Sequence, residues 1–183
     1  MSSFIYLFTA FVFDVYLGTL FGGSFVGLNF SANSNIMLIT LILITYKQDL
    51  IKSMLLGLVV GLVFDAFNID TVFMFAIIYM VTTWAVSAWS TRINDTFIEI
   101  FLVTLSAIFL KEFFVYLAYV FLKGYRLSFG SWGASHLFFT LLLALLPTVV
   151  AVLFKINLLD KNTRQQQRNM KWDKTIKRYV IFF

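Results

Sequence analysis

Four ionisable side chains interrupt long apolar runs of this sequence, namely Asp14, Asp65, Lys111 and Glu112. A carboxylate near the centre of a bilayer costs about 2.5 to 3.5 kcal/mol on insertion scales, so such a residue normally faces a bundle interior and has a partner. Buried charges of this kind serve helix packing, the docking of another membrane protein, or a proton or ion relay. The sequence leaves these three roles open.

The two charges of the pair Lys111 and Glu112 are adjacent in the sequence. Neighbouring residues on a helix point about 100° apart, so we expect that the two side chains do not both face one partner directly and that at least one of them reaches across. Asp14 and Lys111 each fall near the centre of an apolar run. We therefore predict an ion pair between Asp14 and Lys111.

Small residues accompany two of the carboxylates at four-residue spacing, which places each set on one stripe of a helix. The two sets are Ala10, Asp14, Gly18 and Gly22, and Gly57, Gly61 and Asp65. Glycine at this spacing lets another backbone approach closely. Each stripe is predicted to be a contact face, either for a helix of the same chain or for a membrane partner.

Catalytic and metal-binding patterns are not recognised. Ser135 and His136 are neighbours, but adjacency points their side chains in different directions, and no carboxylate at helical spacing orients the imidazole. Phosphate-binding glycine loops are missing, cysteine is absent and histidine occurs once. The chain is predicted to be a non-enzyme that needs no cofactor and no metal.

The elements that position these residues must be membrane helices. Hydrophobic residues make up 61% of the chain and charged residues 13%, and the mean hydropathy is +0.90. A soluble domain would need roughly 25% charged residues. Six apolar runs of helical type follow one another, over residues 4–21, 36–46, 51–67, 72–89, 97–122 and 137–154. We expect an all-α integral membrane protein with a bundle of six transmembrane helices.

The run over residues 36–46 is short for a span. Eleven residues reach under about 20 Å at 1.5 Å per residue. It is therefore a half-helix, a re-entrant segment, or a span that includes the polar stretch of residues 29–35 inside the bundle.

Residues 155–183 hold eight of the fourteen Lys and Arg residues. Positive charge favours the cytoplasmic side, so this tail and, with six spans, the N-terminus are predicted to be cytoplasmic. The chain divides into a membrane domain, residues 1–154, and a basic tail, residues 155–183. The tail could also lie on anionic membrane lipids. Nucleic-acid binding is not expected.

Two stretches resemble the bacterial rod shape-determining MreD family. "GLVVGLVFDAF" with the downstream Tyr79 looks like that family's glycine and aspartate block, and "ALLPTVVAVLFKINLL", with Pro147 and Thr148, looks like its last helix, in which Leu-Pro-Thr opens an apolar run. The family usually has glycine about eight residues after the aspartate, where this chain has Phe73.

The resemblance implies a scaffold of the cell-elongation complex in the bacterial cytoplasmic membrane, which supports peptidoglycan synthesis and cell shape. It implies the single-span protein MreC as a direct partner, with MreB, RodA and a class B penicillin-binding protein in the same assembly. Asp65 resembles the family's signature aspartate, with a role in packing or docking. Self-association is left open.

The family is similar in fold to the substrate-binding S-components of energy-coupling-factor vitamin transporters, which gives an alternative function. The predicted outer loop, residues 123–135, and the following His136 offer aromatic rings and Arg126 to a vitamin pocket. Ala10 and Gly18 could then form a coupling face. Such a pocket needs convergent polar groups, and few are evident in the sequence.

Overall fold

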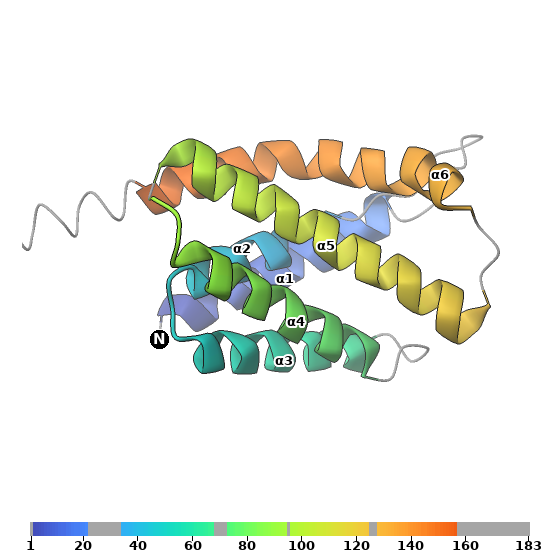
Figure 1. Ribbon diagram of the computed structural model, residues 1–183, viewed down its shortest axis with the longest axis horizontal. Coiled ribbons are helices and arrows are strands. Elements are labelled where there is room, and N and C mark those ends of the chain that lie inside the picture. Colours follow the sequence, from blue (N-terminus) through green and yellow to red (C-terminus); the bar gives the residue numbers. More distant parts are fainter. Residues whose placement is uncertain (1, 22–33, 68–72, 95, 125–127, 157–183) are drawn as a thin grey trace, which may run out of the picture.

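The computed structural model describes residues 2–21, 34–67, 73–94, 96–124 and 128–156, and these residues form helices with no strand among them (Figure 1). The helices are α1 (Ser2–Phe21), α2 (Ile36–Thr45), α3 (Leu50–Phe67), α4 (Met74–Ser90), α5 (Phe97–Lys123) and a last helix, Phe129–Ile156. The last helix begins with α6 (Phe129–Trp132) and a π-helical segment, Gly133–Leu137.

Five of the six predicted helices agree with the structure to within two residues at each end. The sixth was predicted from residue 137 and instead begins at Phe129. The prediction of an outer loop over residues 123–135 is therefore wrong for residues 129–135, which are helical. Ser128 caps this helix by accepting a hydrogen bond from the Ser131 N–H.

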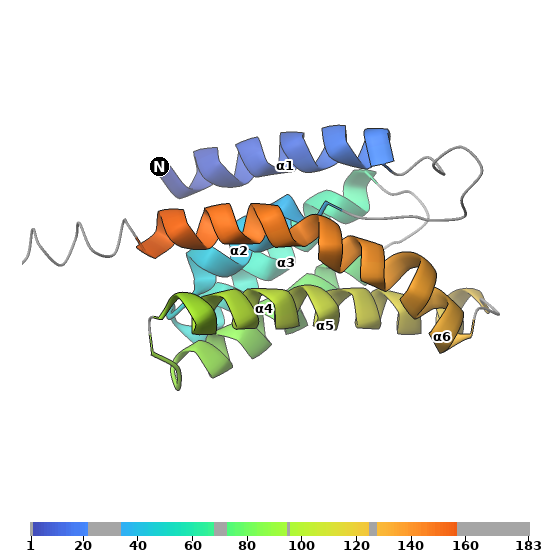
Figure 2. The same ribbon diagram turned by 90° about the horizontal axis from the view of Figure 1, so that it is seen from above.

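Among the described residues, three helices are long and apolar enough to cross a membrane by length and composition, namely α3, α5 and the last helix. The apolar parts of α1, α2 and α4 are shorter. The helices run side by side along the long axis of the molecule, and the N-terminus and the end of the last helix lie at the same end (Figures 1 and 2).

Helix α2 forms the centre of the bundle. Leu38, Leu41 and Ile42 have no exposed surface, and α2 packs against α1, α3, α4 and α5. Its ten residues span about 15 Å, half of a hydrocarbon core. Ser34 and Asn35, directly before it, are also buried. The short second run is therefore a ten-residue helix whose polar entry, Ser34 and Asn35, lies inside the protein, while residues 29–33 lie outside the described residues.

The outward faces of the bundle are apolar. Phe4 and Phe8 on α1, Trp84 on α4 and Leu146 on the last helix are each more than 40% exposed. A water-soluble surface would not carry so many large apolar side chains, whereas acyl chains solvate them well.

Candidate functional site

A buried polar cluster is centred on the Glu112 carboxylate of α5. Its Oε1 accepts hydrogen bonds from Lys111 Nζ at 2.8 Å and from Asn35 Nδ2 at 3.0 Å, and its Oε2 lies 3.1 Å from His136 Nε2. Lys111 Nζ also donates to Asn35 Oδ1 at 3.0 Å. Glu112, Asn35 and Lys111 are at most 4% exposed. The cluster therefore joins α5, the entry to α2 and the last helix through hydrogen bonds.

Lys111 and Glu112 both contact Asn35, and the long lysine side chain reaches across to Asn35 and to Glu112. The predicted Asp14–Lys111 ion pair is not formed, because Lys111 Nζ pairs with the Glu112 carboxylate at 2.8 Å. Asp14 instead accepts hydrogen bonds from the Ser34 hydroxyl and, at 3.0 Å, from the Ile36 N–H.

Both ends of the short helix α2 are bound by charged side chains of other helices. The Asp14 carboxylate of α1 accepts from the first N–H of α2, and Lys155 Nζ of the last helix donates to the Leu43 carbonyl near its C-terminus at 2.9 Å. An anion at the N-terminus and a cation at the C-terminus both complement the helix dipole. Asn35 enters the helix with a φ of 55°, a left-handed conformation that asparagine tolerates better than most residues.

His136 reaches Glu112 from the π-helical segment of the last helix. Such single-turn insertions are frequent at functional sites because they reposition side chains. The His136 ring lies beside Trp132, with centroids 6.2 Å apart, and Trp132 packs on Tyr116 of α5 at 4.6 Å. Sequence reasoning missed the contacts of Asn35 and His136 with Glu112, because no local spacing relates these residues.

The glycine stripe of α3 is a contact with α4 of the same chain. A Cβ atom added at Gly57 would lie 2.7 Å from the Tyr79 carbonyl oxygen, and one added at Gly61 would lie 2.5 Å from that of Phe75. Real Cβ atoms essentially never come within 3.0 Å of a neighbouring atom. The two backbones therefore touch at Gly57 and Gly61, and this face is already occupied.

Asp65 caps the N-terminus of α4. Its Oδ1 and Oδ2 accept hydrogen bonds from the N–H groups of Phe75 at 3.1 Å and Ala76 at 2.9 Å. The buried Tyr79 stacks on Phe64, with ring centroids 5.3 Å apart. This geometry favours packing within the chain over docking as the role of Gly57, Gly61 and Asp65.

The backbone at Phe73 has a φ of 60°, directly before α4 begins. Glycine adopts this left-handed region freely, whereas it is unusual for a bulky residue. The Phe73 side chain is 61% exposed, so little burial compensates for the conformation.

The remaining predicted residues have the following places. Ala10 is buried, and Gly18 lies within α1. Gly22, Arg126 and residues 157–183 lie outside the described residues.

Pro147 and Thr148 lie inside the last helix rather than at its start. The buried Thr148 hydroxyl has no hydrogen-bond partner in the described part of the chain. The last helix also continues two residues beyond the predicted domain boundary at residue 154.

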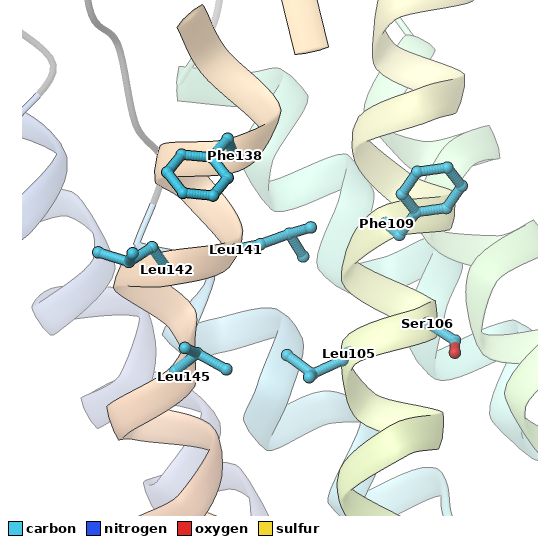
Figure 3. Close-up of a pocket in the computed structure, with 7 residues that line it drawn as sticks. All are labelled: Leu105, Ser106, Phe109, Phe138, Leu141, Leu142 and Leu145. Carbon is cyan, nitrogen blue, oxygen red and sulfur yellow. The ribbon is translucent and has the colours of Figure 1, made fainter. Parts of the chain in front are cut away.

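An open groove of about 450 Å³ lies between α5 and the last helix (Figure 3). It is lined by Leu105, Ser106, Phe109, Phe138, Leu141, Leu142 and Leu145. Apart from the Ser106 hydroxyl, these side chains offer no polar group. The residues of the polar cluster do not line this groove.

Both Glu112 oxygens are engaged and the residue is fully buried. Within the described ranges, no group of three or more His, Cys, Asp or Glu residues could hold a metal ion. Comparisons of the chain with protein-family models, curated proteins and solved structures gave no match.

Proposed function

We propose that this chain is a non-enzymatic scaffold of the bacterial cell-elongation complex, similar to MreD. It lies in the cytoplasmic membrane with six helical segments and both ends in the cytoplasm. It binds the single-span protein MreC and, through the assembly with MreB, RodA and a class B penicillin-binding protein, supports lateral peptidoglycan synthesis and cell shape.

The observation that carries the proposal is the backbone at Phe73. The MreD family usually has glycine at this distance from its signature aspartate, and the φ of 60° is a conformation that favours glycine. The side chain departs from the family pattern, but the backbone has the conformation that such a glycine would adopt.

The other residues of the resemblance also act together. Gly57, Gly61, Asp65 and Tyr79 meet in one interlocked contact between α3 and α4. A helix pair whose glycine face and Asp65 are engaged within the chain suits a scaffold, because its outward faces are then left for lipids and partners. The N-terminus and the end of the last helix lie at the same end of the bundle, in keeping with an even number of passes (Figure 1).

The test is a mild-detergent pull-down of the tagged chain from its native membrane, with partners identified by mass spectrometry. We expect recovery of a single-span coiled-coil protein together with RodA and a transpeptidase. Depletion of the chain should turn elongated cells round. Recovery of a transmembrane coupling subunit with two ATPases would overturn the proposal.

Two variants separate docking from packing in the same experiment. Asp65→Leu removes the cap of α4, and Asp49→Leu is the matched control, because Asp49 is an exposed acid just before α3 whose carboxylate pairs with Lys52 Nζ at 2.8 Å. We expect Asp65→Leu to lower thermal stability and partner recovery together. Loss of the partner at unchanged stability would make Asp65 a docking residue.

The polar cluster favours a second candidate, the S-component of a vitamin transporter. The structure brings Asn35, Lys111, Glu112 and His136 together, which supplies convergent polar groups that the sequence did not reveal. For this candidate, purified protein should bind a vitamin, and the binding should be lost in Glu112→Gln. The growth defect of a deletion strain should also be rescued by excess vitamin.

A further inference from the structure

The charges around the entry to α2 are unequal in number among the described residues. Asp14 and Glu112 each bring a carboxylate, and Lys111 brings one ammonium group, which pairs with Glu112 and attracts Asp14 from a greater distance. Residues 22–33, which join α1 to this entry, contain no ionisable side chain. The remaining ionisable group of the cluster is His136, whose protonation would supply the second positive charge.

The contact between His136 and Glu112 fixes where that proton binds. His136 Nε2 lies 3.1 Å from Glu112 Oε2, while Oε1 accepts from Lys111 and Asn35. An ionised carboxylate only accepts hydrogen bonds, so Nε2 carries a hydrogen in this contact and Nδ1 is the nitrogen that gains or loses a proton. The imidazolium makes the same hydrogen bond charge-assisted and therefore stronger.

His136 is also the member of the cluster that reaches the surface. Its side chain is 16% exposed, whereas that of Glu112 is fully buried and that of Lys111 is 5% exposed. His136 lies about 10 Å from the start of the last helix, which is at the end of the bundle opposite to the N-terminus (Figure 1). A proton from water can reach the imidazole there without an opening of the bundle.

The surrounding groups favour the charged imidazole. Lys111 repels a second cation, but it is already paired with Oε1 of Glu112. Tyr79 of α4 lies within electrostatic range of Asp14 and Glu112 and is uncharged at neutral pH. The Trp132 ring, with its centroid 6.2 Å from that of His136, is an aromatic neighbour of the kind that attracts cations. A net charge is costly at membrane depth, so neutralisation of the second carboxylate stabilises the cluster.

We propose that this cluster is a proton-binding site of the membrane domain, in which His136 takes up one proton and pairs as an imidazolium with Glu112. The proton comes from water and adds to Nδ1, and no other covalent bond changes. Uptake strengthens the hydrogen bond between α5 and the last helix, and release weakens it. The site does not rest on the proposed function, because it requires no partner and no vitamin.

The test uses the fact that the chain contains one histidine, so its imidazole nitrogens give unambiguous signals. The full chain is labelled with 15N-histidine, placed in phospholipid nanodiscs and titrated by NMR. Glu112→Gln should lower the proton affinity of the imidazole about tenfold or more, because it removes the paired carboxylate. Asp14→Asn should lower the affinity by a smaller factor, and it retains a side-chain oxygen for the Ile36 N–H if Glu112→Gln does not fold.

Glu99→Gln is the matched control. It is the same chemical change on the same helix, thirteen positions and about 20 Å from Glu112, which is beyond the range of screened charges. The control should titrate like the wild type. Equal proton affinity in the wild type and the Asp14 and Glu112 variants would overturn the proposal.

A further variant tests whether an arginine supplies the balancing charge instead. Arg126 precedes the last helix in the sequence and lies outside the described residues. Arg126→Gln should leave the titration of His136 unchanged. A proton affinity raised about tenfold or more in this variant would assign the second positive charge to Arg126 and would overturn the proposal.

The effect on helix packing is measured on the unmodified chain. Hydrogen-exchange protection of residues 110–114 and 134–138 is compared at about pH 5.5 and about pH 7.5, on either side of the range in which histidine changes its charge. After correction for the intrinsic exchange rate, protection should be greater at the lower pH at these residues and unchanged in α3. Equal protection at both pH values would show that the proton does not strengthen the contact between α5 and the last helix.

Discussion

Gly61→Ala is the change that most directly tests the contact between α3 and α4. The added Cβ would lie 2.5 Å from the Phe75 carbonyl oxygen and 2.7 Å from the Ala76 nitrogen. Ordinary contacts at Cβ begin at 3.4 Å, so the helices must separate by about 1 Å locally. Both obstructing atoms belong to the backbone and cannot rotate away.

This displacement also affects the cap of α4. The Asp65 carboxylate binds the N–H groups of the same two residues at 3.1 and 2.9 Å, and a shift of about 1 Å would stretch both hydrogen bonds beyond 3.5 Å. Overpacking typically costs about 1 to 3 kcal/mol. We therefore expect Gly61→Ala to lower the equilibrium constant for folding about 5- to 150-fold.

The assay is reversible unfolding in mixed micelles of a mild detergent and dodecyl sulfate. Gly130→Ala is the control, because Gly130 is helical and nothing lies within 4 Å of its added Cβ. Alanine is the better helix former, so Gly130→Ala should be neutral or stabilising by up to about 1 kcal/mol. Equal stability of the two variants would show that the backbones of α3 and α4 are not in contact at Gly61. Normal stability with loss of a partner would show that the glycine face docks another protein.

Three further changes follow from the same structure. Lys111→Met leaves the buried Glu112 carboxylate with Asn35 and His136 but without its lysine, and Glu112→Leu leaves the buried Lys111 ammonium without its carboxylate, so each single change should cost about 3 to 5 kcal/mol. The double variant should unfold at a denaturant concentration closer to the wild type, and a double variant as weak as the sum of the singles would contradict the pairing. Phe73→Gly should raise stability by about 1 kcal/mol in the same unfolding assay, since it relieves a left-handed φ at a largely exposed side chain, and a loss of stability would refute that strain. Lys155→Met should free the Leu43 carbonyl and speed hydrogen exchange at the end of α2, and unchanged exchange there would refute the role of this lysine as a cap.

Local properties of the sequence predicted the helices well. A membrane helix must satisfy its backbone hydrogen bonds within one apolar run, so the position and length of each run largely fix the element. The ten-residue α2 and the spacing of Gly57, Gly61 and Asp65 could be recognised for the same reason. The start of the last helix was missed because glycine and serine there are typical of a loop, yet Ser128 serves as a helix cap.

Tertiary structure alone decided the partners of the buried charges. The sequence places Asp14, Lys111 and Glu112 in helices, but a charged side chain binds whichever group the packing brings within about 3 Å. Asn35 reaches Glu112 only because α2 begins in the middle of the bundle, and His136 reaches it only because the last helix contains a π-helical turn. These contacts join residues up to 77 positions apart. Spacing along one helix carries no information about them, because they depend on how the helices are arranged in three dimensions.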